Sequence, residues 1–228
     1  MTTPSRPSTV ALTQLVIRSS YGGATLDRSQ AILAAARSVF TRSGYRGASI
    51  DEIARTAGVA KGSVYTYFAS KDALFAVVVA ETVAAVEAVA VRALDDELPF
   101  VTSLNRALRA ALSARARSPL MMRLDAEAAS AGTPAVIAAL RRMEATLVRF
   151  TEGQLMLALA HGAIRPHPRR GVAVALVAAH AALLAEAGAT AGRIPEADAL
   201  GSMDLLARGL CLDVAEMNRM TDRVVWSF

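Results

Sequence analysis

Cysteine, lysine and aromatic residues are scarce in this sequence, and each shortage narrows the range of folds and functions. The single cysteine, Cys211, cannot form an intrachain disulfide, so nothing points to an oxidising compartment, and its apolar surroundings suit a place in the core. Aromatic residues make up 5% of the chain although 54% is hydrophobic, because alanine is abundant. Strand-like alternation is rare, whereas apolar residues recur at spacings of three and four. The sequence therefore predicts an all-α fold.

Long apolar runs and catalytic motifs are missing as well. No run approaches the roughly 20 residues of a membrane-spanning helix, and the apolar residues 10–17 are broken by Thr13 and Gln14 without a signal-peptide cleavage pattern. We therefore expect a cytoplasmic protein without membrane contact. His161 and His180 are far apart and lack neighbouring cysteine or acidic ligands, so no metal site is expected. Without a glycine-rich phosphate loop or a nucleophile elbow, we predict neither a cofactor nor catalytic residues.

Positive charge is concentrated in the first third of the chain. The net charge is +5, and residues 1–75 hold 9 Lys or Arg against 4 Asp or Glu, whereas residues 76–228 hold 16 of each. The two lysines, Lys61 and Lys71, both lie in this basic third. The distribution favours contact between that third and phosphate groups. The alternative is ordinary variation in the charge of solvated surfaces.

Two short helices joined by a glycine turn are expected within residues 49–71. Ser49, followed three residues later by Glu52, forms a capping-box pattern that satisfies two backbone donors at a helix start. Gly58 supplies a turn conformation that other residues resist. A second helix is expected over residues 61–68, with a serine just beyond it to cap the next helix. The pattern is typical of a helix-turn-helix.

The second of these helices has one apolar side and one small polar side. Helices this short are stable only when packed, and Val64 and Phe68, one turn apart, are expected to be buried. The opposite side carries small residues that can form hydrogen bonds, between two tyrosines: Gly62, Ser63 and Thr66, flanked by Tyr65 and Tyr67. Such a face suits the major groove of DNA.

Apolar spacing and helix-breaking residues predict the remaining elements. A helix is expected from Asp27, with a buried stripe at Ile32, Leu33, Ala36, Val39 and Phe40, ending at Gly44 as a left-handed cap. Phe40 and Tyr45 are expected to fill a small core. Residues 1–26, rich in Ser, Thr, Pro and Gly, read as a flexible arm. Further helices are expected over residues 71–97, 101–118, 119–132, 134–161, 170–187 and 196–219.

The run AILAAARSVFTRSGYRGASIDEIARTAGVAKGSVYTYFASKDALF, residues 31–75, resembles the N-terminal signature of the TetR/AcrR family of bacterial transcriptional regulators. The shared features include the Gly44-Tyr45 break, Ala57-Gly58-Val59, Lys61-Gly62-Ser63 and Tyr67-Phe68. The resemblance implies an all-α homodimer in which a three-helix DNA-binding domain, residues 27–72, precedes a helical ligand-binding and dimerisation domain, residues 73–228. It also implies that ligand binding releases the DNA operator.

The resemblance also assigns roles to individual residues. It implies phosphate contacts at Ser49, Tyr67 and Lys71, and it places Lys61, Gly62, Ser63, Tyr65 and Thr66 on the face that meets bases and backbone. The charge of Lys71 opposes the dipole of the helix it begins, and a phosphate partner would explain it. Ala60 departs from the family, which often has a capping serine there. Its absence weakens the second helix by about 1 kcal/mol.

The middle and last helices offer candidates for an effector site and a dimer interface. Flexible apolar side chains suit a hydrophobic effector, and His180 is a candidate polar handle; the apolar candidates are Met121, Met122, Met143, Phe150 and Met156. Two final apolar helices suit a dimeric four-helix interface, through Val174, Leu176, Val177, Leu183 and Leu184 in one and Leu205, Leu206, Leu210 and Val214 in the other. For both sets the alternative is plain intramolecular core.

These features predict a homodimeric, sequence-specific DNA-binding transcriptional regulator. We expect a repressor that a small hydrophobic effector of unknown identity releases from a palindromic double-stranded DNA operator. One alternative is a helical small-molecule-binding protein or enzyme with a vestigial DNA-binding domain, which the intact motif and the lack of a catalytic constellation disfavour. An activator, or a regulator without an effector, is equally compatible with the sequence.

Overall fold

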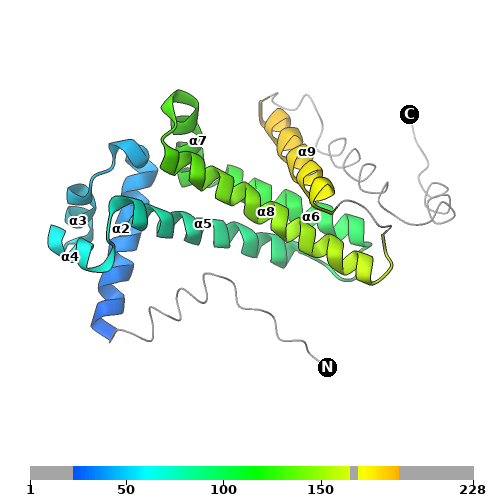
Figure 1. The fold of residues 1–228 in the computed structure, drawn as a ribbon, viewed down its shortest axis with the longest axis horizontal. Helices are drawn as coiled ribbons and strands as arrows, with labels where there is room; N and C mark the ends of the chain where they lie inside the picture. The colour runs from blue at the N-terminus through cyan, green and yellow to red at the C-terminus, as the bar shows by residue number, and fades with distance from the viewer. Residues whose placement is uncertain (1–22, 165–168, 190–228) are drawn as a thin grey trace. The chain divides into compact units, whose positions relative to one another are not determined.

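A computed structural model describes residues 23–164 and 169–189, and the statements below concern these residues. They form eight α-helices and no strand (Figure 1). The helices are α2 (Gly23–Gly47), α3 (Ile50–Ala57), α4 (Lys61–Tyr67), α5 (Lys71–Ala93), α6 (Phe100–Ala116), α7 (Pro119–Ala131), α8 (Pro134–Ala160) and α9 (Arg169–Ala189). The predicted helix over 196–219, with Cys211 and the four residues assigned to its dimer face, lies outside the described residues.

Two predicted helix boundaries differ from the structure. Helix α2 begins at Gly23 and not at Asp27, so the last residues of the expected arm are helical. Helix α5 ends at Ala93 and not at residue 97, so the acidic run Asp95-Asp96-Glu97 lies beyond it. The other described boundaries agree closely, because local signals set them. Ser118 caps α7, since its hydroxyl accepts from the backbone N–H of Met121 at 3.4 Å.

The chain divides into two compact units, each made of separate stretches of sequence, and the predicted domains stay a prediction. Among the described residues, the first comprises residues 23–85 and 116–143, and the second comprises residues 86–115, 144–164 and 169–189. We call helices α2, α3 and α4, together with the first turn of α5, the head. Helix α7 and the start of α8 belong to the same unit as the head. The domain boundary predicted at residue 72 falls inside this first unit.

The core of the first unit is built on the predicted stripe of α2 and on a cluster of aromatic rings. All five stripe residues are buried, as expected: Ile32, Leu33, Ala36, Val39 and Phe40. The Phe40 and Phe75 rings lie 5.0 Å apart at 71°, and the Tyr45 and Phe75 rings lie 4.8 Å apart. Phe75, on α5, completes the small core for which the sequence had suggested only Phe40 and Tyr45.

In the second unit, α9 supplies both buried and exposed apolar side chains. Leu176 and Val177 are buried, whereas Val174 is 42% exposed. Leu183 is half-buried, and the side chain of Leu184 is outside the described set. The predicted dimer interface through the last two helices stays a prediction.

Helix α5 is apolar and long enough to cross a membrane, by length and composition alone. The sequence did not indicate this, because polar residues interrupt the apolar run. An 18-residue window within it has a mean hydropathy of 2.2. Part of its apolar surface packs in the protein core, however: 44% of this window is buried, and Leu74, Val78 and Val79 are at most 1% exposed. Buried helices of globular proteins pass the same test, so this is weak evidence for a membrane span.

Candidate DNA-binding site

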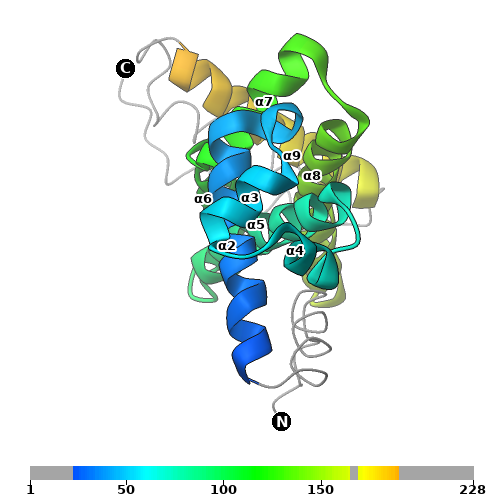
Figure 2. The ribbon, with the colours of Figure 1, turned by 90° about the vertical axis from the view of Figure 1, so that its left-hand side faces the viewer.

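The turn between α3 and α4 has most of the caps expected from the sequence, and Figure 2 shows these two helices in front of α2. The Ser49 hydroxyl accepts from the backbone N–H of Glu52 at 3.1 Å. Gly58, with φ 68° and ψ 30°, is left-handed and ends α3. Of the predicted capping box, only the hydrogen bond to the Ser49 hydroxyl forms, because the Glu52 carboxylate instead accepts from Arg42 at 2.6 Å.

Helix α4 turns Val64 inward and a polar face outward. Val64 is fully buried, but Phe68 is half-buried, so the predicted buried pair is only half right. Tyr65 is 48% exposed. The remaining residues predicted to meet bases and backbone divide into exposed Lys61, Gly62 and Thr66 and half-buried Ser63 and Tyr67. Helix α4 thus has the outward surface that a recognition helix needs, and we call it the recognition helix.

The recognition helix lacks a side-chain cap at its start, as predicted. Ala60 has extended backbone angles and offers no side-chain acceptor. The backbone N–H of Ser63 donates to the Ala60 carbonyl at 2.9 Å, and the Thr66 hydroxyl donates to the Gly62 carbonyl at 3.1 Å. The helix is therefore held by its own backbone, by Val64 and by this bond.

Lys71, predicted to contact phosphate, is half-buried and bound to backbone carbonyls. Its ammonium donates to the carbonyls of Tyr45 at 3.0 Å and Ala48 at 3.1 Å, and it lies 4.4 Å from the centre of the Tyr45 ring. These acceptors lie at the end of α2, where carbonyl groups lack helical partners. The structure therefore explains the lysine without a phosphate, and these bonds use two of its three donors.

Most basic side chains of the head are already paired. Arg37 binds Glu81 at 2.5 Å, Arg42 binds Glu52 at 2.6 Å, Lys61 binds Asp51 at 2.9 Å, and Lys71 binds the two carbonyls. Arg28, Arg46 and Arg55 are exposed and have no ion-pair partner among the described residues. Among the described residues of the basic third, the cations without an ion pair are therefore these arginines and Lys71, whose carbonyl partners do not cancel its charge. The arginines lie outside the recognition helix, and the motif alone did not single them out.

Two side chains of α7, one turn apart, hold the end of α2, and we call them the α7 clamp. The carboxylate of Glu127, which is 9% exposed, accepts from the backbone N–H groups of Tyr45 at 2.7 Å and Arg46 at 3.1 Å. Arg123 donates to the Ser43 carbonyl at 3.3 Å. The clamp satisfies both donors and an acceptor where α2 breaks. No local sequence signal links residues this far apart.

Gly44 is the residue at which α2 breaks. It has a positive φ of 72°, as a left-handed cap would, but its ψ of −179° is extended, so the predicted cap conformation is wrong. A Cβ added there would lie 2.4 Å from a Glu127 oxygen and 3.1 Å from Arg123 Nε. Glycine is required by both the backbone angle and the closeness of the clamp.

Tyr45 also connects α2 to α5. Its hydroxyl donates to the carboxylate of Asp72 in the first turn of α5. Burial, this hydrogen bond, and the negative charges of Asp72 and Glu127 raise the pKa of Tyr45 to about 12. The phenol stays protonated at neutral pH, and α2, α5 and α7 meet at this one residue.

A cavity of about 250 Å³ lies in the first unit, between α5 and the start of α8. Its buried lining is apolar, whereas two charged side chains, Asp72 and Arg142, are exposed. The lining consists of Asp72, Phe75, Ala76, Val79, Ala135, Ala138, Ala139 and Arg142. Asp72 and Phe75 are the α5 residues that contact the hydroxyl and the ring of Tyr45.

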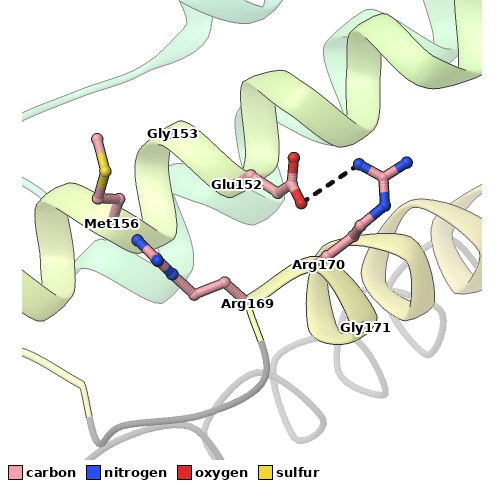
Figure 3. A pocket seen from close by; sticks show the side chains of 6 residues that line it. All are labelled: Glu152, Gly153, Met156, Arg169, Arg170 and Gly171. Carbon is pink, nitrogen blue, oxygen red and sulfur yellow. Dashed lines mark ion pairs between the residues drawn. The ribbon is translucent and has the colours of Figure 1, made fainter.

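A second cavity, of about 570 Å³, lies in the second unit where α8 meets the first turn of α9. Figure 3 shows Arg170 turned toward Glu152, with which it forms an ion pair at 3.7 Å, while Arg169 extends toward Met156. Gly153 and Gly171, which have no side chains, complete the lining.

Of the residues predicted to bind an effector, Met156 lines the second cavity, and the others line neither cavity. Met121 and Met143 are buried, Met122 is 59% exposed, and Phe150 is 9% exposed. His180 is buried: its Nδ1 donates to the Leu176 carbonyl at 2.8 Å, and its Nε2 has no hydrogen-bond partner among the described residues. Burial lowers the pKa of His180, so the ring is neutral.

This arrangement defines a helix-turn-helix protein of the DNA-binding class, in which the exposed second helix enters the major groove. Residues 32–78 match the model of the family described as bacterial regulatory proteins, tetR family. The chain is 32% identical over 142 residues to the uncharacterized HTH-type transcriptional regulator YhgD of Bacillus subtilis (strain 168), covering 62% of this chain and 74% of YhgD. The chain belongs to the TetR family and is a transcriptional regulator.

Solved structures agree with this assignment. A TetR-like transcriptional regulator from Rhodococcus sp. RHA1 matches with a TM-score of 0.51 and 28% identity, over 80% of this chain and 94% of that one. Reduced NemR of E. coli matches with a TM-score of 0.59 over 82% of this chain and 97% of NemR, but at 19% identity it shows the fold alone. The predicted all-α fold, with a helix-turn-helix preceding further helices, is confirmed.

Proposed function

We propose that this regulator is a repressor that binds a near-palindromic operator as a homodimer and leaves it when a small hydrophobic effector binds. The observation that carries the DNA-binding half is the recognition helix: Val64 is fully buried, while Tyr65 and Thr66 on its other sides are exposed. Two such helices in a symmetric dimer would enter successive major grooves, which requires a symmetric site. Dimerisation is assigned to the last two helices.

The roles of individual residues follow the placement of their side chains. Lys61, Gly62, Ser63, Tyr65 and Thr66 are assigned to the face that meets bases and backbone, and Ser49 and Tyr67 to phosphates. Ser49 keeps lone pairs after capping α3. Lys71 contributes its remaining N–H donor to a phosphate at the same time as it holds the end of α2.

For the effector, the 250 Å³ cavity of the first unit is the site that we assign. Its apolar lining suits a small hydrophobic compound, and Arg142 favours one that carries an acidic group. A ligand there would touch Asp72 and Phe75, and through them Tyr45 at the end of α2. Effector binding would then shift the head by changing contacts that the operator-bound state uses.

The DNA-binding proposal is tested by mapping the protein on its own upstream DNA and then comparing Tyr65→Ala with Tyr65→Phe. Tyr65→Ala should lose operator binding and keep its unfolding midpoint, because the side chain is exposed, whereas Tyr65→Phe should keep most of the affinity. An unchanged gel shift for Tyr65→Ala would contradict the docking, and no preference for upstream DNA over random duplex would contradict the function.

The effector site is tested by filling the cavity. Ala138→Met places a longer side chain over an exposed part of the lining and should leave operator affinity unchanged while abolishing release by benzoate, used as a small aromatic acid. Met122→Ala, outside the cavity, is the matched control. Release of Ala138→Met by the same benzoate concentration as wild type would place the effector elsewhere, with the regulator function intact.

We further infer that the protein is cytoplasmic and has no enzymatic activity, since its relatives are transcriptional regulators. Turnover of a bound metabolite by the purified protein would favour the alternative of an enzyme with a vestigial head.

A further inference from the structure

The recognition helix begins at an ion pair that the motif did not predict. Lys61, its first residue, donates to Asp51 in the first turn of α3, with Nζ and Oδ2 2.9 Å apart. Both side chains are open to solvent, at 54% and 68% exposure. Tyr65 lies one turn beyond Lys61 on the same side of the helix and is 48% exposed. These three residues form one edge of the DNA-facing surface.

A carboxylate at this position is costly if the surface only meets phosphates. Like charges repel, and an acid beside a lysine cancels the attraction that a free lysine has for the DNA backbone. The dipole of α3 does not by itself call for Asp51, because Glu52 already places a negative charge in that turn. Glu52 in turn is paired with Arg42. Asp51 therefore lies on the DNA-facing surface, and α3 does not need its charge, because Glu52 already places a negative charge in the first turn.

The base edges of the major groove do offer partners for a paired cation and anion. A guanine presents two acceptors there, O6 and N7, to which lysine donates, and its paired cytosine presents the N4 amino group, from which a carboxylate accepts. The edge of one G·C pair thus carries acceptors and a donor side by side, which matches an adjacent ammonium and carboxylate. Residues at the start of a recognition helix are the ones that reach base edges.

We propose that Asp51 and Lys61 act together as a base-reading pair that selects a G·C pair in each operator half-site. The inference rests on the proposed DNA-binding function and adds the sequence preference to it. Lys61 donates to the guanine, Asp51 accepts from the cytosine, and the ion pair keeps Lys61 from turning to a phosphate. Asp51 is a specificity-determining residue, although it belongs to the first helix of the motif.

The test compares base-pair preferences on the mapped operator. Wild type, Asp51→Ala, Lys61→Met and the double variant are measured at one salt concentration against operators in which each base pair of a half-site is replaced in turn. In wild type, changing one G·C pair per half-site to A·T should weaken binding by roughly tenfold or more. In each variant the same change should weaken binding by less than about twofold, and the double variant should resemble the single ones.

Two further measurements separate base reading from other roles. If Lys61 only binds phosphate, Lys61→Met will weaken every sequence equally and lower the slope of log K against log salt by about 0.9, and the G·C penalty will survive; this result overturns the proposal. Arg141→Met, exposed on α8, controls for the loss of one positive charge. Equal base preferences in wild type and Asp51→Ala also overturn the proposal of a base-reading pair. In that case, loss of operator binding by Tyr65→Ala would show that the recognition helix still docks as proposed. Absence of any preferred DNA for wild type overturns both proposals.

Discussion

At the scale of single residues, Tyr45 does more than the sequence indicated. Its backbone N–H, carbonyl, ring and hydroxyl are used by Glu127, Lys71, Phe75 and Asp72 respectively. An aromatic residue just after a helix-breaking glycine is expected to fill a core, and Tyr45 does. The partners of its polar groups lie 26 to 82 residues away, so no local pattern could reveal them.

Replacing Tyr45 by phenylalanine isolates the hydroxyl. Below pH 10 the variant should lose about 1 kcal/mol of unfolding free energy, the usual worth of one hydrogen bond. The pKa of Tyr45 is raised from 10.0 to about 12 by folding, so the unfolded state loses its proton first. The hydroxyl's contribution is therefore complete below pH 10 and is lost as the pH rises toward 12. Urea unfolding of both proteins between pH 8 and 11 should show their difference narrowing; a difference that grows with pH would contradict this.

At the scale of elements, local signals predicted the helices well, and contacts between helices were beyond them. The serine before α3, the glycine after it and the apolar stripe of α2 each act within one or two turns, so they could be read from the sequence. The contacts of Glu127 on α7, and the pairing of Asp51 with Lys61, depend on how the helices pack. No local sequence pattern marks either contact. The predicted helix-turn-helix was therefore right, while its support from α7 was missed.

Gly44 and Gly58 provide a matched pair for testing the α7 clamp. Both have positive φ, of 72° and 68°, but a Cβ at Gly58 meets nothing, whereas one at Gly44 meets Glu127. Gly58→Ala should cost about 1–2 kcal/mol from backbone strain, and Gly44→Ala clearly more. In thermal or urea unfolding, Glu127→Ala should cost less in the Gly44→Ala background than in wild type. Additive effects of the two changes would contradict the clamp geometry.

Ala60 offers a change that should stabilise the recognition helix. In Ala60→Ser, the hydroxyl can accept from the backbone N–H of Gly62 and should raise the unfolding free energy by about 1 kcal/mol. Ala60→Val adds a side chain without an acceptor and should give no gain. The comparison is made by urea unfolding, and equal stabilisation by both substitutions would mean that the missing cap is not what limits this helix.

At the scale of the whole molecule, the distribution of charge is sharper than the net count suggests. The sequence placed the whole excess of +5 in the first 75 residues, and this drew attention to the two lysines of the motif. In the structure both lysines are engaged, one by Asp51 and the other by carbonyls. Exposed arginines such as Arg46 and Arg55 remain for long-range attraction to DNA. Counting charges predicted the sign of the partner, but only the contacts show which charges are available.

The contrast between paired and unpaired arginines predicts how each arginine affects the salt dependence of DNA binding. Arg46→Ala and Arg55→Ala should each weaken binding to operator and to random duplex by the same factor and should each lower the slope of log K against log salt by about 0.9, because each removes an unpaired cation. Arg37→Ala removes the same formal charge, but Arg37 is paired with Glu81 at 2.5 Å, so its slope should stay near that of wild type. Fluorescence anisotropy titrations between 50 and 200 mM salt, a range over which such slopes are resolved, make the comparison. Equal slopes for Arg37→Ala and Arg46→Ala would mean that DNA responds to the net charge of the chain and not to its free arginines.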